Sequence, residues 1–383
     1  MKNLPELLRQ NVGVDVSKDS LDVVFSTINL QQQIQVKASR KFANTAAGFE
    51  QLHRWVESKR DNTIELRILM EATGIYYEQL AWFVYEKRYA VSVVLPTKAK
   101  RYLQAIGQKS KNDKIDARGL AQMGLEQRLP LWQPLSSNIY RLRLLTRQLE
   151  DFNNQRTMCL NQLHALSHSA YGVKEVEKSL KRVLHGLEKG INQLEKAIAQ
   201  LIEKDEVLQV KVQKILAIKG VGLKTVAVLL AETNGFATFE NQGQLVSYAG
   251  YDIVENQSGK SAGKTRMSKK GNAHIRRAMH LPAFGVVRYK EAAFVNVYQR
   301  LIGRGKTKMQ AYVAVQRKLL ILIWALWRKD EGYNPRFGQK EEATSSNQEP
   351  KPLFSLGSEG DIKKVAPTLV RATLDELPCN QVA

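Results

Sequence analysis

The segment NVGVDVSKDSLDVVFSTI, residues 11–28, decides the fold of the first third of the chain. Valine recurs at every second position from residue 12 to residue 16, which is the period of a β-strand. Residues 21–28 and 33–38 continue as strands separated by short turns, so the chain is expected to open as an antiparallel meander. Asp15 stands in the middle of the first of these apolar strands.

Strand and helix patterns alternate after the meander. We predict helices over 45–58, 76–88, 98–106 and 114–127, and strands over 64–71 and 90–95. This order is typical of an α/β domain covering roughly residues 8–130. Residues 137–169 and 173–202 read as helices, and residues 208–330 as mainly helical, with one strand expected at 251–255. The overall fold class predicted is therefore α/β plus α.

The second long helix carries apolar residues spaced 3, 4, 3, 4, 3, which is an a/d seam. They are Leu184, Leu187, Ile191, Leu194, Ile198 and Leu201. The seam fits either a helical hairpin within one chain or a coiled-coil dimer stalk. We therefore expect four regions: a domain over 1–132, a helical or coiled-coil region over 133–207, a helical domain over 208–330, and a disordered tail over 331–383.

Composition narrows the class of protein. The chain has 383 residues and a formal net charge of +21, and residues 331–383 are net acidic, so the excess lies in residues 1–330. A strongly basic surface most often binds nucleic acid. Two cysteines exclude a disulfide framework and a Cys-rich zinc site. The longest apolar run, residues 319–327, is too short to span a bilayer, so we expect a cytoplasmic, DNA-associated protein with no membrane contact.

Four carboxylates stand out. Asp15 and Glu71 interrupt apolar strands, and Asp113 and Asp116 lie three apart at a helix start, where they face the same way. Singly, each has a plain structural interpretation: Asp113 suits an N-cap, and Glu71 suits the turn at 72–74. Together they could converge on one or two Mg²⁺ ions, which prefer oxygen ligands and activate a phosphodiester for displacement. Their order along the chain matches the ribonuclease-H-like fold.

Two segments of the second half are suited to phosphate contact. Residues 214–232 form a helix–hairpin–helix pattern around Gly220 and Gly222, with Lys224 just after; a plain αα turn is the alternative. Residues 258–277 hold seven basic residues, no acid and three glycines. The basic residues are Lys260, Lys264, Arg266, Lys269, Lys270, Arg276 and Arg277. His274 is a candidate phosphate contact or helix-face residue.

Ser258 opens this basic segment, followed by glycine and lysine, where cations would favour its attack on phosphorus. From these residues alone, Ser258 cannot be distinguished from Ser261 or Ser268. No Ser-His-Asp arrangement is indicated. A serine in such a segment can act as a nucleophile on phosphorus, and the alternative is a loop serine that is simply polar.

The chain resembles the DEDD transposases of the insertion-sequence one-ten family, related to the Piv DNA invertases. The motifs that carry the resemblance are GVDVSKDSLDV, EATGIYYE, KNDKIDARGLA, KGVGLKTVAVLLAE, SYAGYDIVENQSGKS and RMSKKGNAHIRRAM. The resemblance implies a RuvC-type nuclease domain, a coiled-coil region and a transposase domain. It assigns Mg²⁺ binding to Asp15, Glu71, Asp113 and Asp116, and a covalent phosphoserine intermediate to Ser258.

The same resemblance implies partners: donor and target DNA, a structured bridge RNA that pairs with both, and other copies of the chain in a dimer or tetramer with a composite site. The expected activity is site-specific recombination that inserts and excises a mobile element. The alternatives are a Piv-like invertase, a metal-dependent Holliday-junction nuclease that uses water instead of Ser258, and a basic nucleic-acid-binding protein without catalysis.

Overall fold

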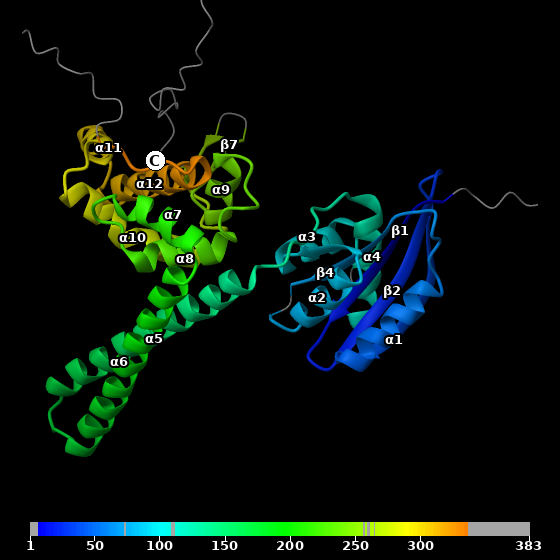
Figure 1. The fold of residues 1–383 in the computed structure, drawn as a ribbon, viewed down its shortest axis with the longest axis horizontal. Coiled ribbons are helices and arrows are strands. Elements are labelled where there is room, and N and C mark those ends of the chain that lie inside the picture. Colours follow the sequence, from blue (N-terminus) through cyan, green and yellow to red (C-terminus); the bar gives the residue numbers. More distant parts are fainter. Residues whose placement is uncertain are drawn as a thin grey trace, which may run out of the picture. The chain divides into compact units, whose positions relative to one another are not determined.

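The computed structural model describes residues 7–335, except residues 73, 109–111, 256, 259–260 and 264, and gives residues 257–258 and 261–262 by backbone alone. The chain forms two compact units, Met1–Pro134 and Leu135–Ala383, called here the N-terminal and C-terminal units and taken separately (Figure 1). Nearly all of the tail for which disorder was expected lies outside the described residues.

A five-stranded mixed sheet forms the centre of the N-terminal unit. Its order is β3-β2-β1-β4-β5; β1, β2 and β3 run antiparallel, whereas β4 and β5 run parallel to β1. The predicted meander and the two later strands are confirmed. Their bounds are β1 Leu7–Val16, β2 Ser20–Asn29, β3 Ile34–Ala43, β4 Leu66–Glu71 and β5 Ala90–Val94.

Helices cover both faces of this sheet, as α/β patterning requires. One face packs its valines and Phe25 against α1 (Ala46–Glu57) and α2 (Glu78–Glu86). The other face packs against α3 (Pro96–Ala105) and α4 (Asp113–Glu126). Alternation along β1 thus separates a large apolar face from a second face that is closed by α4.

Gly13 explains how closely α4 lies on β1. A Cβ at Gly13 would lie 2.2 Å from the carbonyl oxygen of Ala117 and 2.2 Å from the backbone nitrogen of Ala121. Earlier on the same face of the strand, Asn11 donates from Nδ2 to the Ala121 carbonyl at 3.1 Å. Helix and strand therefore meet backbone to backbone, a contact that only glycine permits. The first turn of α4 is brought to the end of β1 that carries Asp15.

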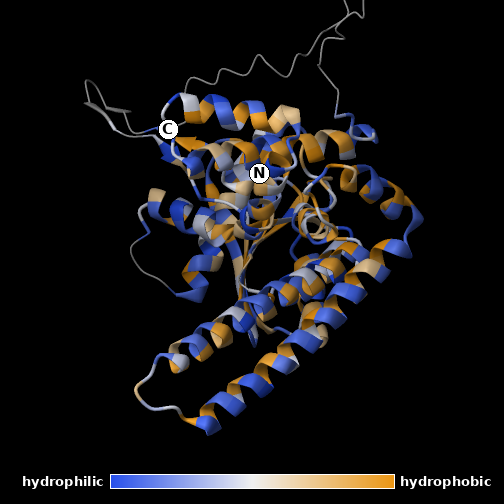
Figure 2. Cartoon of the chain, turned by 90° about the vertical axis from the view of Figure 1, so that its left-hand side faces the viewer, coloured by the Kyte–Doolittle hydropathy of each residue, from blue (hydrophilic) through white to orange (hydrophobic). Residues whose placement is uncertain are grey.

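The C-terminal unit is helical, with a short β-ribbon. Helices α5 and α6 pack along each other as a hairpin, called here the arm, and Figure 2 shows both as largely hydrophilic with apolar residues at intervals. Of the two possibilities for the a/d seam, the hairpin is the one observed. The helices are α5 Ser137–Ser167, α6 Lys174–Glu203, α7 Glu206–Leu216, α8 Leu223–Thr233, α9 Gln242–Ala249, α10 Ala273–Arg288, α11 Ala292–Gly303 and α12 Lys308–Lys329.

One hydrophobic core joins the base of the arm to α7–α12. Leu142 and Leu149 of α5 and Ile198 of α6 belong to the same cluster as Leu319 and Ile323 of α12. Helix α12 is long and apolar enough to cross a membrane by length and composition, but its buried face lies in this core. The apolar run over 319–327 is therefore part of α12.

Candidate functional site

The four predicted acids all belong to the N-terminal unit and lie on the elements expected for them. Asp15 is near the end of β1, Glu71 is the last residue of the neighbouring parallel strand β4, and Asp113 and Asp116 are in the first turn of α4. The N-cap of α4 is Asn112, which accepts from the Ile115 N–H through its side chain at 2.8 Å. Capping was the alternative role for Asp113, and Asn112 fills it.

The electrostatics of Asp15 show that the other three acids lie near it. Burial raises the pKa of Asp15, the charges of Asp116, Asp113 and Glu71 raise it further, and the pKa reaches about 6. A nearby like charge disfavours ionisation, so these carboxylates lie close enough to repel Asp15. The structure therefore gathers the four acids that the sequence singled out.

A fifth acid, Asp22, also raises the pKa of Asp15 and was missed from the sequence. The β1–β2 register pairs Asp15 with Asp22, which places both on one face of the hairpin. Lys41 of β3 lies opposite Asp22, and its Nζ is 3.2 Å from Asp22 Oδ2. The sequence feature that could have identified Asp22 is the length of the turn at residues 17–20. This length fixes which residues of β1 and β2 face each other.

The residues fit a divalent cation by their chemistry. Hard oxygen ligands whose mutual repulsion raises a carboxyl pKa are the donor set that Mg²⁺ would neutralise. Within the described residues, however, no group of three or more His, Cys, Asp or Glu side chains is already arranged to hold a metal ion. The acids converge without forming a closed coordination shell.

The basic segment of the C-terminal unit is part of a β-ribbon, of which the strand at 251–255 was predicted. Strands Ile253–Val254 (β6) and Arg266–Met267 (β9) pair antiparallel, and further along Gln257–Ser258 (β7) pairs with Ser261–Ala262 (β8). Ser258 is directly opposite Ser261. The side chains of Ser258 and Ser261, and the whole of Lys260 and Lys264, lie outside the described residues. Ser258 thus belongs to a two-stranded ribbon.

The two ends of the ribbon are clamped together at a neck formed by Gly250 and Gly271. A Cβ on Gly271 would lie 2.5 Å from the backbone nitrogen of Gly250, and the Asn272 N–H donates to the Tyr248 carbonyl at 2.7 Å. The Ser268 hydroxyl donates to the Asp252 carboxylate, within the stem. Of the three candidate serines, Ser268 therefore already has a structural hydrogen bond.

An ion pair between a buried carboxylate and a partly exposed arginine supports this neck and was not anticipated. Glu232 at the end of α8 is 2% exposed, and Arg147 of α5 donates to it in bidentate fashion at 2.8 and 3.0 Å. Asn272 donates to the same carboxylate at 2.7 Å and also caps α10. Burial alone would raise the pKa of Glu232, but these hydrogen bonds outweigh burial and lower it. The arm, α8 and the ribbon neck are thus fixed to one another.

The predicted phosphate-contacting cations differ in what they touch. Arg266, Lys269 and Lys270 are exposed. Others are partnered: Arg277 pairs with Glu150, Lys224 pairs with Glu195, and Arg276 donates to the Ala249 carbonyl at 2.9 Å. His274 contacts Glu150 through Nδ1 at 2.5 Å, which corresponds to the helix-face interpretation.

The glycines of the predicted hairpin between α7 and α8 have different roles. Gly220 has φ +97°, and a Cβ there would lie 2.7 Å from the backbone of Gly285 in α10. Gly222 caps α8 and faces open space. Gly220 is therefore required by backbone conformation and packing, whereas the surroundings of Gly222 leave room for a ligand.

Comparison with known proteins found matches for both units of the chain. A family model described as "Transposase" matches residues 12–172, and one described as "Transposase IS116/IS110/IS902 family" matches residues 212–299. The pilin gene-inverting proteins of Moraxella lacunata and Moraxella bovis are 32% and 31% identical over 331 residues, which is 85% of this chain and 98% of each relative. The "Insertion element IS110 uncharacterized 43.6 kDa protein" of Streptomyces coelicolor is 32% identical over 122 residues, 32% of this chain and 30% of that protein.

Among solved structures, the chain is similar to Thermus thermophilus RuvC, with 11% identity and a TM-score of 0.26, over 32% of this chain and 99% of that one. It is also similar to the fowlpox virus Holliday junction resolvase, with 12% identity and a TM-score of 0.24, over 30% of this chain and 97% of that one.

Proposed function

Because the chain belongs to the IS110-type DEDD transposase family, related to the pilin gene-inverting proteins, we propose that it is a site-specific recombinase that cuts and rejoins the DNA strands of an insertion sequence. The observation that carries the proposal is the gathering of Asp116, Asp113 and Glu71 around Asp15, because clustered carboxylates are costly unless they bind a cation. A cluster of this kind is suited to phosphodiester chemistry.

In this proposal Asp15, Glu71, Asp113 and Asp116 hold Mg²⁺. When bound, the ion supplies positive charge that polarises the scissile phosphate and stabilises its displacement. The four side chains would supply the oxygen ligands that hold such an ion at the end of β1. The raised pKa of Asp15 reflects the repulsion from the neighbouring carboxylates that a bound cation would relieve.

Ser258 is the proposed nucleophile. Its hydroxyl oxygen forms a bond to phosphorus as one bond from phosphorus to a sugar oxygen breaks; the serine proton is lost and the leaving oxygen gains one. The phosphoserine ester replaces the DNA phosphoester that was broken. A DNA hydroxyl can therefore attack the phosphoserine, release Ser258 and rejoin the strand. The basic residues of 260–277 offset the charge that develops on phosphorus.

The proposed partners are donor and target DNA, a structured bridge RNA that pairs with both, and further copies of the chain in a dimer or tetramer. Support comes from the charge: the basic excess lies in residues 1–330. Exposed Arg266, Lys269 and Lys270 supply sequence-independent phosphate contacts.

Inversion of a DNA segment is the second candidate outcome of the same chemistry. It is favoured by one observation: the relatives that match over 98% of their length are gene-inverting proteins, whereas the insertion-element protein of Streptomyces coelicolor matches over 122 residues. Plasmids that carry either a mobile element with its flanks or a segment between inverted sites separate the two outcomes. The product that forms identifies the reaction.

The decisive experiment compares Ser258→Ala with Ser261→Ala, its partner across the ribbon. We expect Ser258→Ala to bind DNA and RNA without forming a covalent DNA adduct, and Ser261→Ala to retain the adduct. Adducts that survive Ser258→Ala would remove Ser258 from the mechanism; strand cleavage without any adduct would instead indicate a water-dependent nuclease. Sequencing the RNA that co-purifies with the protein tests whether the protein binds a bridge RNA.

Asp15→Asn provides the second arm, with the exposed Asp19→Asn as the matched control. Loss of recombination in the first variant alone is expected. If chelation of Mg²⁺ and Asp15→Asn both leave recombination intact, the acids serve only the fold.

A further inference from the structure

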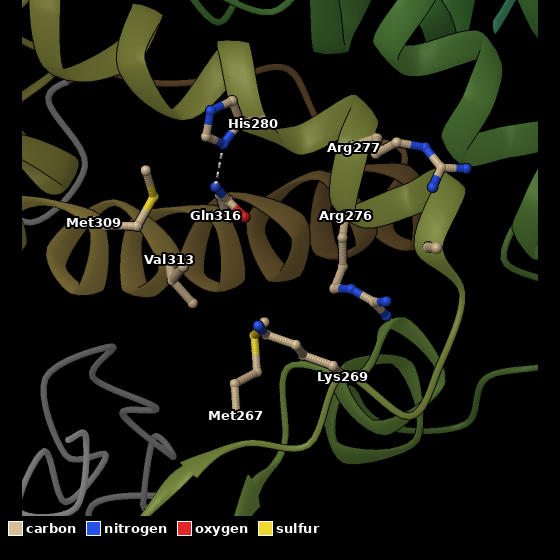
Figure 3. A pocket seen from close by; sticks show the side chains of 9 residues that line it. Met267, Lys269, Arg276, Arg277, His280, Met309, Val313 and Gln316 are labelled. Atoms are coloured by element: carbon tan, nitrogen blue, oxygen red, sulfur yellow. Dashed lines mark hydrogen bonds between the residues drawn. The ribbon is translucent and has the colours of Figure 1, made fainter. Parts of the chain in front are cut away.

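A cavity of about 370 Å³ lies in the C-terminal unit between the foot of the ribbon, α10 and α12. Figure 3 shows Met267 and Lys269 entering it from the ribbon side, Arg276 from α10, and Met309 and Val313 from α12. Met267 is paired with Ile253, five residues before Ser258. At roughly 3.3 Å per residue, at most about 17 Å of ribbon separates the cavity from the Ser258 backbone.

One part of the cavity wall is cationic. Arg276 donates to a neutral backbone carbonyl, that of Ala249, and Arg277 is paired with Glu150. Over the part of the chain that the structure describes, no carboxylate oxygen lies within 4.0 Å of Lys269 or Arg276. Two cations without a counter-charge beside a cavity attract an anion.

The backbone of Lys269 is held in a defined conformation at the edge of the cavity. Its φ of +52° is in the left-handed region, which costs a non-glycine residue about 1 kcal/mol. The conformation is held by a hydrogen bond from the Lys269 N–H to the Gly250 carbonyl at 3.2 Å, at the ribbon neck. Strain of this kind persists where the surrounding structure imposes it, commonly at binding sites.

The other part of the wall is apolar, with fixed polar atoms beside it. Met267, Met309 and Val313 supply sulfur and aliphatic surface, which packs well against flat rings. Gln316, 4% exposed, accepts from the Tyr251 hydroxyl at 2.9 Å and donates to Nδ1 of His280 at 3.3 Å. With Nδ1 accepting, a neutral His280 ring carries its proton on Nε2 and offers a donor.

We propose that this cavity receives one unpaired nucleotide of a DNA or RNA strand that runs beside the ribbon. The phosphate would contact Arg276 and Lys269, and the base would lie against Met267, Met309 and Val313. The volume is at the small end for a single-ligand pocket and matches one nucleotide better than a larger ligand. The inference rests on the proposed function, since a strand must reach Ser258, and it adds a nucleotide-binding site to that function.

The test uses the full chain carrying Ser258→Ala, so that no covalent step contributes, and short single strands of DNA and of RNA with one sequence. Each strand is made intact and as a series in which one position at a time is abasic. We expect Arg276→Gln to weaken binding of the intact strand about tenfold and Arg276→Lys to retain most affinity. Arg288→Gln is the matched control: Arg288 is exposed on the same helix, roughly 18 Å further along, and should change affinity about twofold or less.

Cavity-filling substitutions test the base contact. Val313→Trp should weaken binding of the intact strand about tenfold yet leave affinity unchanged for the strand whose abasic position matches the cavity. Met309→Trp, at a half-exposed rim position that tolerates a larger side chain, should behave alike if Val313→Trp impairs folding. The type of strand, DNA or RNA, whose binding is weakened more by these substitutions is the one that supplies the nucleotide.

Equal weakening of the intact strand and every abasic strand would overturn the base contact, and equal effects of Arg276→Gln and Arg288→Gln would overturn the phosphate contact. Failure to bind any single strand would likewise refute the site. These outcomes are distinct from failure of the proposed function, which is read from adduct formation by the chain that retains Ser258.

Discussion

Replacing Asp15 by asparagine should stabilise the protein while abolishing recombination. Burial and the charges of Asp116, Asp113 and Glu71 raise the pKa of Asp15 from 3.8 to about 6. A pKa raised by about 1 corresponds to about 1.36 kcal/mol, so the full penalty for ionising Asp15 would be about 3 kcal/mol. Because the side chain is only partly buried, solvent screening lowers this to about 1–2 kcal/mol.

The sign of the pH dependence follows from linkage. A carboxyl whose pKa is raised by folding destabilises the native state as pH rises from the unfolded pKa through the folded one. The native chain should therefore equal Asp15→Asn in stability near pH 4, lose stability relative to it up to about pH 6, and stay about 1–2 kcal/mol below it at about pH 8.

Urea unfolding at these pH values measures the difference, and millimolar Mg²⁺ should restore stability to the native chain and leave Asp15→Asn unchanged. Asp19→Asn is the control with no expected effect. If Asp15→Asn is no more stable than the native chain at about pH 8, then Asp15 does not experience the repulsion on which the proposed cation site depends.

Three further substitutions test the scaffold. Gly13→Ala places a Cβ 2.2 Å from the α4 backbone and should cost about 1–3 kcal/mol in urea unfolding and weaken Mg²⁺ stabilisation; retained stability would mean that α4 does not lie on β1 in this way. Gly220→Ala, with φ +97° and Gly285 at 2.7 Å, should lower the thermal midpoint by about 2–4 °C or more, where the open Gly222→Ala should not. Glu232→Gln removes the charge of the buried carboxylate that pairs with Arg147 and should cost about 1.5–3 kcal/mol, against almost nothing for the exposed Glu240→Gln.

Much of the N-terminal unit could be predicted from the sequence because its elements are defined by local periodicity. The alternation at residues 12–16 identified β1, and the two helical acids were placed in the first turn of α4 by their spacing. The gathering of the acids depends on Gly13, whose contact with α4 spans more than a hundred residues of sequence. No pattern within a short window carries that information.

The C-terminal unit shows where sequence reasoning stops. The a/d seam of α6 indicates that this helix packs against another helix. It does not show that the partner is α5 of the same chain. Only the strand at 251–255 was predicted from the ribbon; its other strands were missed because they are two residues long, show no alternation, and are held by Gly250 and Gly271, which are 21 positions apart. Asp22 and the Glu232 ion pair were missed for the same reason: their partners come from register and tertiary packing.

The direct seating of α4 on β1 sets how exact the carboxylate cluster can be. Side-chain layers hop between rotamers and repack, so groups held across them drift by fractions of an ångström. Here main chain rests on main chain at Gly13, and the interval between a strand carboxylate and a helix carboxylate is governed by bonded geometry and one sliding coordinate. A shift of the helix along the strand would move the backbone of Asp113 and Asp116 relative to that of Asp15, so the glycine contact couples the position of α4 to the cluster.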